Sequence, residues 1–498
     1  MLGALGFGAA TLPAARASAG GSPVPVAPYE SGVVVVGFRQ GASAAAAHVA
    51  IARSGIARAA VVDGNFSTVS LRAGTSVGDA LARLRRGRAI AWAVPDYLAH
   101  AAGLPPALPA WPAVTDAQSR QADLPAPFYP NDPGSADGPP GGWREVQWNF
   151  DGQFGVGAPQ AWANVAQAGH PGGAGVIVAV LDTGVAYTNH GPFIRSPDFT
   201  AKEFVKGYDF VSHSAYPEDR NGHGTQVAGT IAEATNNGIG VTGLAYGARV
   251  MPVRVLDSLG DGGASTIARG IYWAVDNHAQ IINLSLEFTA GTIKASSIPE
   301  LIDAIDYAHA NNVLVVAASG NEGVDQLSYP AKAKWVLSVG ATTQDGCLGY
   351  YSNFGAGLTL VAPGGGADAD LPNDPHCHPN STNDGDIVQE TFADIESPSV
   401  RVFGLPEGYY GTSMAAPHVS ATAALVIASS VLGPHPTVKA IVNQLTATAT
   451  PLGGGGGDRR HYGAGLLDAA AATAPVGSTG PTGPSGPTGA TGATVASR

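Results

Sequence analysis

The sequence predicts an α/β fold: a three-layer core with a mostly parallel sheet and helices on both faces, preceded by a small α+β domain. Apolar, β-branched runs at residues 175–181 and 313–318 have the composition of strands buried on both faces. Glycine-containing turns follow these runs, and small-residue helical segments follow other such turns. Residues 32–100 instead read as β-α-β-β-α-β, the order of a ferredoxin-like sandwich.

The small domain, placed at residues 31–100, can be assigned element by element. A strand is expected at 33–38, an alanine-rich helix at about 43–54, and short strands at 59–62 and 68–71. A second helix at 77–86 and a closing strand at 91–97 complete the order. Residues 101–127 are rich in Pro and Ala and are expected to form an exposed linker.

The two ends of the chain have biased compositions. Residues 1–30 contain a weakly apolar stretch and A-x-A cleavage candidates at 15–19, as in part of a secretory signal, but lack a basic n-region. A disordered Ala-rich terminus is the alternative. In residues 475–498, glycine recurs every third position from Gly477 to Gly492, as in collagen. A flexible tail is expected, with a trimerising or surface-attaching element as the alternative.

Composition excludes some classes of partner. The formal net charge of −12 disfavours nucleic acid, because nucleic-acid binders concentrate Lys and Arg. No apolar stretch reaches the roughly 18 residues that a membrane span needs. We therefore expect no nucleic-acid partner and no membrane span. A monomer is expected, with a trimer possible through the tail.

Four polar residues in glycine-rich settings point to acyl transfer. Asp182 follows the run at 175–181, His223 begins a small-residue helix, Asn321 follows the run at 313–318, and Ser413 begins another helix. Each alone has a structural interpretation, such as a helix N-cap for the serine. Together they supply what a serine nucleophile requires, namely a base and a donor to the oxyanion.

The order of these residues distinguishes between hydrolase classes. It is Asp, His, Ser, whereas α/β-hydrolases have Ser, Asp, His. The segment G-T-S-M-A also lacks the second glycine of a G-x-S-x-G elbow. An esterase of the α/β-hydrolase type is therefore disfavoured.

The motifs V-L-D-T-G, H-G-T-Q-V-A-G and G-T-S-M-A-A-P-H, within residues 128–474, resemble those of the subtilisin-like serine peptidases. The resemblance implies that Asp182 orients His223, that His223 is general base and then acid, and that Ser413 attacks the scissile carbonyl. Asn321 and the Ser413 backbone N–H would form the oxyanion hole.

The same resemblance implies a secreted endopeptidase that hydrolyses proteins and is made as a self-processed zymogen. Residues 31–100 resemble the family's inhibitory propeptide, which would block the cleft until the chain is cut within residues 101–127. The alternatives are an unrelated accessory domain and, for the whole chain, a non-catalytic surface or adhesion protein that retains the peptidase fold.

Two segments resemble the family's substrate-flanking strands, although a plain turn is the alternative for the first. They comprise Gly260, Asp261 and Gly262, and Ser285, Leu286 and Glu287. Ala318 and Gly320 would line the pocket for the residue before the cut, with small groups that leave room for a large apolar side chain. Glu287 stands where many relatives carry glycine, and it could favour basic or polar residues or point into solvent. Broad specificity is expected.

Residues 235–241 form an oxygen-rich, glycine-containing loop of the kind that calcium prefers. It resembles the family's calcium loop, and a glycine-rich turn is the alternative. The resemblance implies a structural calcium, not required for catalysis, with five ligand residues: Asp198, Thr235, Asn237, Ile239 and Val241.

The chain has two cysteines, Cys347 and Cys377. In an exported protein they could pair, which would close a loop of about 30 residues and contribute roughly 3–4 kcal/mol in the chain-entropy model. His376 and His378, with Asp370 and Asp374, could imitate a metal site. Adjacent ligands chelate poorly, so a polar insertion at 364–395 is the preferred interpretation.

Overall fold

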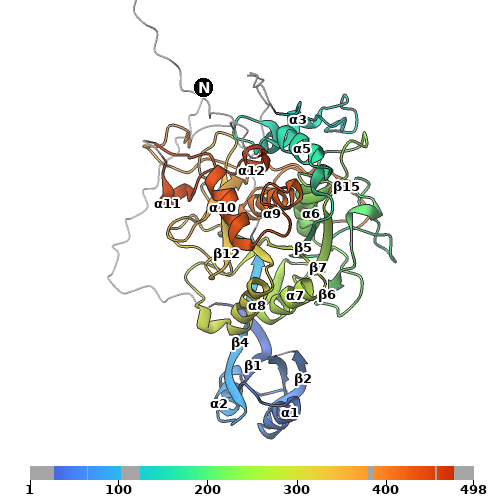
Figure 1. The fold of residues 1–498 in the computed structure, drawn as a ribbon. Coiled ribbons are helices and arrows are strands. Elements are labelled where there is room, and N and C mark those ends of the chain that lie inside the picture. The colour runs from blue at the N-terminus through green and yellow to red at the C-terminus, as the bar shows by residue number, and fades with distance from the viewer. Residues whose placement is uncertain (1–26, 64, 103–123, 380–384, 455–456, 476–498) are drawn as a thin grey trace, which may run out of the picture.

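The computed structural model describes residues 27–63, 65–102, 124–379, 385–454 and 457–475 (Figure 1). The signal-like residues 1–26, most of the expected linker and residues 476–498 of the G-X-Y tail lie outside the described residues. Within the described part, no helix is both long and apolar enough to cross a membrane.

The N-terminal domain has the expected β-α-β-β-α-β order. Its elements are β1 (Tyr29–Phe38), α1 (Ala44–Arg53), β2 (Ala57–Asp63), β3 (Phe66–Leu71), α2 (Val77–Leu84) and β4 (Ile90–Ala101). The strands pair antiparallel in the order β4-β1-β3-β2. Alternate residues of β1, Val34 and Val36, pack with residues of both helices, such as Ile51 and Leu84, in a separate small core.

The large domain contains a seven-stranded parallel sheet in the order β13-β12-β11-β9-β5-β7-β6. Its strands are β5 (Ile177–Asp182), β6 (Tyr208–Asp209), β7 (Arg249–Arg254), β9 (Ile281–Leu284), β11 (Leu314–Ala318), β12 (Val336–Thr342) and β13 (Leu360–Pro363). Apolar residues fill both faces, as parallel sheets require. The fold class expected from the sequence is confirmed.

Helices cover both faces of this sheet. Val178 and Val180 of β5 pack in one apolar cluster with helices on the upper side in Figure 1, and Ala179 and Leu181 pack in the other. The first face carries α5 (Ala158–Gln167), α6 (His223–Ala232), α9 (Thr412–Ser429), α10 (Val438–Thr448) and α12 (Ala469–Thr473). The second carries α7 (Ala264–Asp276) and α8 (Pro299–Ala310).

Shorter elements complete the large domain. They are α3 (Trp143–Val146), α4 (Trp148–Asp151), α11 (Arg459–Tyr462), β8 (Asp261–Gly263), β10 (Leu286–Glu287), β14 (Thr391–Phe392) and β15 (Phe403–Gly404). Three turns of 3₁₀-helix lie at Pro171–Gly173, Ala201–Glu203 and Ala295–Ser297.

Strand β4 joins the two domains and is longer than the sequence suggested. The closing strand was expected at 91–97 and the linker from residue 101, but β4 extends to Ala101 and pairs antiparallel with both β8 and β10. The edges of these two strands supply hydrogen-bond partners for the backbone N–H and C=O groups of residues 98–101. In Figure 1, β4 rises from the N-terminal domain past α7 and α8. The sequence alone could not show this pairing, because the partner strands are more than 150 residues away.

Cys347 and Cys377 form a disulfide. The expected pairing is therefore present, and neither thiol is available as a metal ligand. The bridge ties the turn after β12 to the polar insertion at 364–395, whose residue Asp374 accepts a hydrogen bond from the hydroxyl of Tyr462.

Candidate active site

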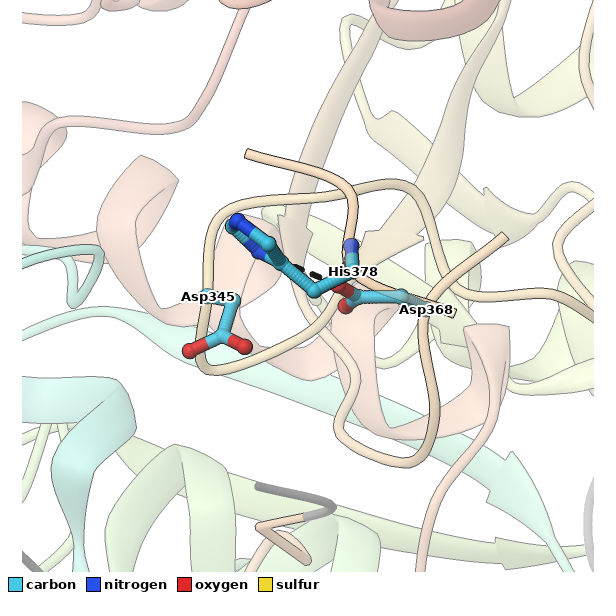
Figure 2. Close-up of side chains that lie close together, drawn as sticks. All are labelled: Asp345, Asp368 and His378. Carbon is cyan, nitrogen blue, oxygen red and sulfur yellow. Dashed lines mark hydrogen bonds and ion pairs between the residues drawn. The ribbon is translucent and has the colours of Figure 1, made fainter. Parts of the chain in front are cut away.

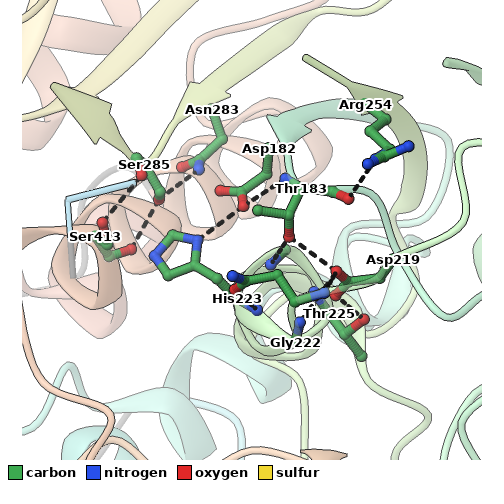
Figure 3. A network of polar contacts seen from close by, with 12 residues as sticks. Asp182, Thr183, Asp219, Gly222, His223, Thr225, Arg254, Asn283, Ser285 and Ser413 are labelled. Carbon is green, nitrogen blue, oxygen red and sulfur yellow. Dashed lines mark hydrogen bonds and ion pairs between the residues drawn. The ribbon is translucent and has the colours of Figure 1, made fainter. Parts of the chain in front are cut away.

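His223 and Asp182 lie against each other at the carboxyl end of β5 (Figure 3). His223 Nδ1 is 2.7 Å from Asp182 Oδ1, and both side chains are buried. His223 is the first residue of α6, preceded by Gly222 at φ +105°, a conformation that favours glycine. Burial lowers the pKa of His223, but the Asp182 carboxylate more than offsets burial, with a further contribution from Asp219, so the pKa is raised.

Asp219, which was not predicted from the sequence, stabilises the turn before His223. Its carboxylate accepts hydrogen bonds from Thr183 Oγ1 at 2.9 Å and from Thr225 Oγ1 at 2.6 Å. It also accepts from the backbone N–H groups of residues 221, 222 and 225. The available signal was an aspartate two residues before the N-G-H-G turn, a position from which a carboxylate can cap the following N–H groups.

Ser413 is the second residue of α9 and lies beside the His223 ring in Figure 3. Its Oγ donates to the carbonyl of Ser285 at 3.0 Å, while His223 Nε2 has no hydrogen-bond partner among the described residues. Ser285 in turn donates its own hydroxyl to the Ser413 carbonyl at 2.8 Å. Rotation of the Ser413 side chain to another staggered χ1 rotamer would break the hydrogen bond to Ser285 and give the hydroxyl a different partner, while α9 stays in place.

Asn321 follows β11 and presents a free amide N–H₂. Its Oδ1 accepts from the backbone N–H of Thr412 at 2.9 Å and from the Thr412 hydroxyl at 2.8 Å. Its Nδ2 is buried and has no partner among the described residues. The amide is thus fixed by its oxygen, and its donor is left for another acceptor.

The end of β4 occupies the groove beside Ser413. The carbonyl of Ala102 accepts from the Ser413 backbone N–H at 3.3 Å, and the Ala102 N–H donates to the Ser285 carbonyl at 3.2 Å. Ala101 N–H donates to the Gly260 carbonyl at 2.8 Å. Both candidate substrate segments therefore flank this peptide, with Asp261 and Gly262 in β8 and Leu286 and Glu287 in β10.

The Glu287 side chain points inward, so the alternative that it points into solvent is wrong. The residue is 2% exposed, and its Oε1 accepts from the Asn321 backbone N–H at 3.0 Å. Burial, with the nearby Glu322 carboxyl as the second cause, raises the pKa of Glu287 to about 8. Ala318 is buried at the end of β11, and Gly320 lies in the following turn at φ +113°.

Two residues of the candidate calcium loop donate hydrogen bonds to Asp198. Asp198 Oδ1 accepts from Asn237 Nδ2 at 2.7 Å, and Oδ2 accepts from the Val241 N–H at 3.0 Å. Asn237 Oδ1 accepts from the Ile239 N–H at 2.8 Å. Thr235 opens the loop, and its hydroxyl donates to the carbonyl of the preceding Glu233.

Three further carboxylates, none of them predicted as ligands from the sequence, surround this loop. Asp132 accepts hydrogen bonds from the N–H groups of residues 236–238. Glu233 and Glu390 lie close enough to Asp198 to interact with it electrostatically. Burial, followed by mutual repulsion, raises the pKa of Asp198 and of Glu233, whose Oε1 is buried without a hydrogen-bond partner. In the described part of the chain these four carboxylates form no ion pair with Lys or Arg. Such an oxygen-rich group fits a calcium ion.

A second acidic group lies near the disulfide (Figure 2). Single ligand atoms of Asp345, Asp368 and His378 lie within 4.8 Å of one another. Both Asp368 oxygens already accept hydrogen bonds, from Thr343 Oγ1 and from the His378 N–H. Of the residues suggested as a metal mimic, His378 belongs to this group, and His376 Nδ1 lies 3.3 Å from Asp374 Oδ1. Among the described residues the four do not come together as one set of ligands.

Comparison with known proteins assigns the family. Residues 173–465 match the model of the Subtilase family, and residues 16–96 match the fervidolysin N-terminal prodomain. The chain is 39% identical to Subtilisin Savinase of Lederbergia lenta over an alignment of 301 residues. This alignment covers 60% of this chain and 91% of the relative.

The similar solved structures include two proteases. One, a protease from Pseudoalteromonas arctica, has a TM-score of 0.54 at 30% identity, covering 70% of this chain and 99% of its own. The other, fervidolysin from Fervidobacterium pennivorans, a keratinolytic enzyme related to subtilisin, has a TM-score of 0.64 at 23% identity, covering 89% of this chain and 61% of its own. The fervidolysin likeness supports the shared fold. With the family match and the prodomain match, the chain belongs to the subtilase family and is a subtilisin-family serine endopeptidase with an N-terminal prodomain.

Proposed function

We propose that this endopeptidase hydrolyses proteins through an acyl-enzyme on Ser413, with His223, Asp182 and Asn321 as its catalytic partners. The observation that carries the proposal is the partnerless Nε2 of the Asp182-bound His223, located beside Ser413, while a peptide carbonyl lies at the Ser413 N–H. Nucleophile, base and bound carbonyl thus meet at one point.

The steps follow from this geometry. Ser413 Oγ attacks the carbonyl carbon while His223 Nε2 takes its proton, and Asp182 stabilises the imidazolium that forms. The oxyanion accepts hydrogen bonds from the Ser413 N–H and Asn321 Nδ2, which is buried and therefore acts in a low dielectric. His223 then protonates the leaving amine, and water hydrolyses the ester by the reverse sequence of proton transfers.

We further propose that the chain is a zymogen divided as 31–100, 101–127 and 128–474, and that its first substrate is its own β4 extension. Residues 98–102 lie as a strand between β8 and β10, with the Ala102 carbonyl at Ser413. This position supports a maturation cut after Ala102, inside the Pro- and Ala-rich stretch. The prodomain then remains bound as a cleaved inhibitor until it dissociates.

We propose that the enzyme is secreted. The disulfide between Cys347 and Cys377 supports export, because disulfides persist in oxidising compartments. The A-x-A sites at 15–19 agree with this destination.

The catalytic proposal is tested by covalent labelling. The matured enzyme is expected to react once with a fluorophosphonate, at Ser413, and to lose casein hydrolysis in proportion to labelling, measured by peptide mass spectrometry and an activity assay. Ser429→Ala, which changes another serine of α9, serves as the control and should label fully. Label on any other residue, or labelling without loss of hydrolysis, would refute the assignment of Ser413.

Calcium is proposed as a structural ion at Asp198, with the carbonyls of Thr235, Ile239 and Val241 and the side chain of Asn237. When bound, it neutralises the buried carboxylates and clamps the loop. Removal with a chelator is expected to lower the melting temperature, since a ligand at about 100 times its Kd stabilises by about 2.7 kcal/mol.

The calcium experiment compares melting curves with and without chelator for wild type and two variants. Asp198→Asn should melt lower and respond little to calcium, whereas Asp306→Asn, at an exposed position of α8, should behave as wild type. A wild-type melting temperature that does not change on chelation contradicts the site and leaves the glycine-rich turn as the interpretation.

A further inference from the structure

The register of β4 places three side chains on one face. Glu287 of β10 lies directly opposite His100 of β4, and opposed residues of an antiparallel pair share a face. Ala102 is two residues beyond His100 and therefore points to the same side. The neighbouring Leu286 packs on the other side, in the apolar cluster that includes Ala99.

The Glu287 carboxyl fills the space on that face. Its Oε1 is bonded to the Asn321 N–H and lies 3.8 Å from His100 Nε2. A Cβ atom added at Gly320 would lie 2.5 Å from Glu287 Oε2 and 2.2 Å from Asn353 Nδ2. The site therefore has no room for even one more methyl group at this turn, and Ala102 itself is fully buried.

A polar network lies against the carboxyl, whose Oε2 is buried and has no hydrogen-bond partner among the described residues. Glu322, the second acidic residue beside Glu287, accepts from Asn353 Nδ2 and from Ser328 Oγ. Ser328 Oγ would also lie 2.5 Å from the added Cβ at Gly320. Glu287 is thus enclosed by the turn that carries Asn321 and by this network, and moving it would leave the Asn321 N–H without its acceptor.

We infer that Glu287 is a specificity-determining residue that closes the pocket for the residue preceding the scissile bond, so that small residues such as alanine are selected there. The inference rests on the proposed cleavage at Ser413. A large side chain in the position of Ala102 must displace the Glu287 carboxyl, which is hydrogen-bonded to the Asn321 N–H and enclosed. The methyl group of Ala102 leaves this carboxyl in place. The small residues of the pocket wall, Ala318 and Gly320, therefore do not create the room that the sequence suggested.

The rival interpretation is electrostatic, because two carboxyls could attract Lys or Arg. The structure favours the steric one. Glu287 is already bonded to Asn321, and the peptide that occupies the groove presents alanine.

The test uses the matured enzyme and three peptide p-nitroanilides that differ only in the final residue: Ala, Phe or Lys. For wild type, kcat/KM for Ala is expected to exceed that for Phe and for Lys by about tenfold or more. In Glu287→Gly the Phe/Ala ratio should rise by about tenfold or more, and Glu287→Gln, which keeps the volume, should retain the preference for Ala over Phe.

Each outcome decides the inference. Wild-type preference for Phe overturns it, as does an unchanged Phe/Ala ratio in an active Glu287→Gly enzyme. Preference for Lys that is lost in Glu287→Gln establishes the electrostatic interpretation instead. If Glu287→Gly does not fold, the wild-type ranking and Glu287→Ala give the same decision. No hydrolysis and no fluorophosphonate labelling at all would refute the proposed function, whereas a different ranking refutes only the role of Glu287.

Discussion

A Ser413→Ala chain is expected to retain the peptide bond after Ala102, whereas the wild-type chain is cut there. The Ala102 carbonyl accepts from the Ser413 N–H, so the bond is bound at the nucleophile before any other substrate arrives. Loss of the serine should slow the chemical step by about a millionfold, the effect known for the corresponding serine of subtilisin. Intact mass and N-terminal sequencing of both purified proteins would measure the difference.

Two controls separate chemistry from folding. Ser429→Ala, in the same helix, should be cut as wild type is. The uncut Ser413→Ala chain should melt cooperatively, since the hydroxyl contributes one hydrogen bond to the Ser285 carbonyl. Cleavage of purified Ser413→Ala after Ala102 at the wild-type rate would contradict both the zymogen proposal and the nucleophile.

Asp96→Ala is expected to shorten the delay between this cut and the appearance of activity. Asp96 of β4 is buried at the start of α7, where its carboxylate accepts from the Ser265 N–H at 3.0 Å and the Ser265 hydroxyl at 2.6 Å. Alanine leaves both donors without partners, at a cost of about 2–3 kcal/mol. This corresponds to about 30- to 150-fold weaker binding of the cleaved prodomain, chiefly through faster dissociation.

The pH dependence gives this prediction a second readout. Burial raises the pKa of Asp96. Burial and repulsion from Asp96 together raise the pKa of Glu300 in α8. Glu30 and Arg269 are the other charged groups that interact with Asp96. Groups with a raised pKa in the bound state favour binding at low pH, and this contribution is lost as the pH rises through the bound-state pKa. The delay should therefore shorten with rising pH, and less steeply in Asp96→Asn.

The measurement is a time course of cleavage on gels beside peptidase activity, at several pH values. Asp79→Ala changes an exposed aspartate in α2 of the same domain and should leave the delay unchanged. An Asp96→Ala delay equal to that of wild type would show that this cap does not hold the prodomain.

Local sequence determined much of the fold and of the candidate site. The run that forms β5 is apolar and rich in β-branched residues, which favours a strand buried on both faces, with Asp182 at its end. Gly222 and Gly411 marked the starts of the helices that carry His223 and Ser413. These signals lie within a few residues of the side chains they position.

The rest depends on contacts between distant segments. β8 is Asp-Gly-Gly, which has no strand propensity, and it is a strand because β4 pairs with it. β10 has two residues, both buried, so alternation could not tell whether Glu287 points inward. Asp132 acts through backbone N–H groups of a loop about 100 residues away, so no local pattern in the sequence indicates its role.

Strand β4 belongs to two sheets at once, pairing with β1 in the small domain and with β8 and β10 in the large one. Occupancy of the groove and folding of the small domain are therefore linked in one equilibrium. A protease or denaturant that unravels β2 and β3 loosens the strand that fills the groove, although it never touches the groove itself.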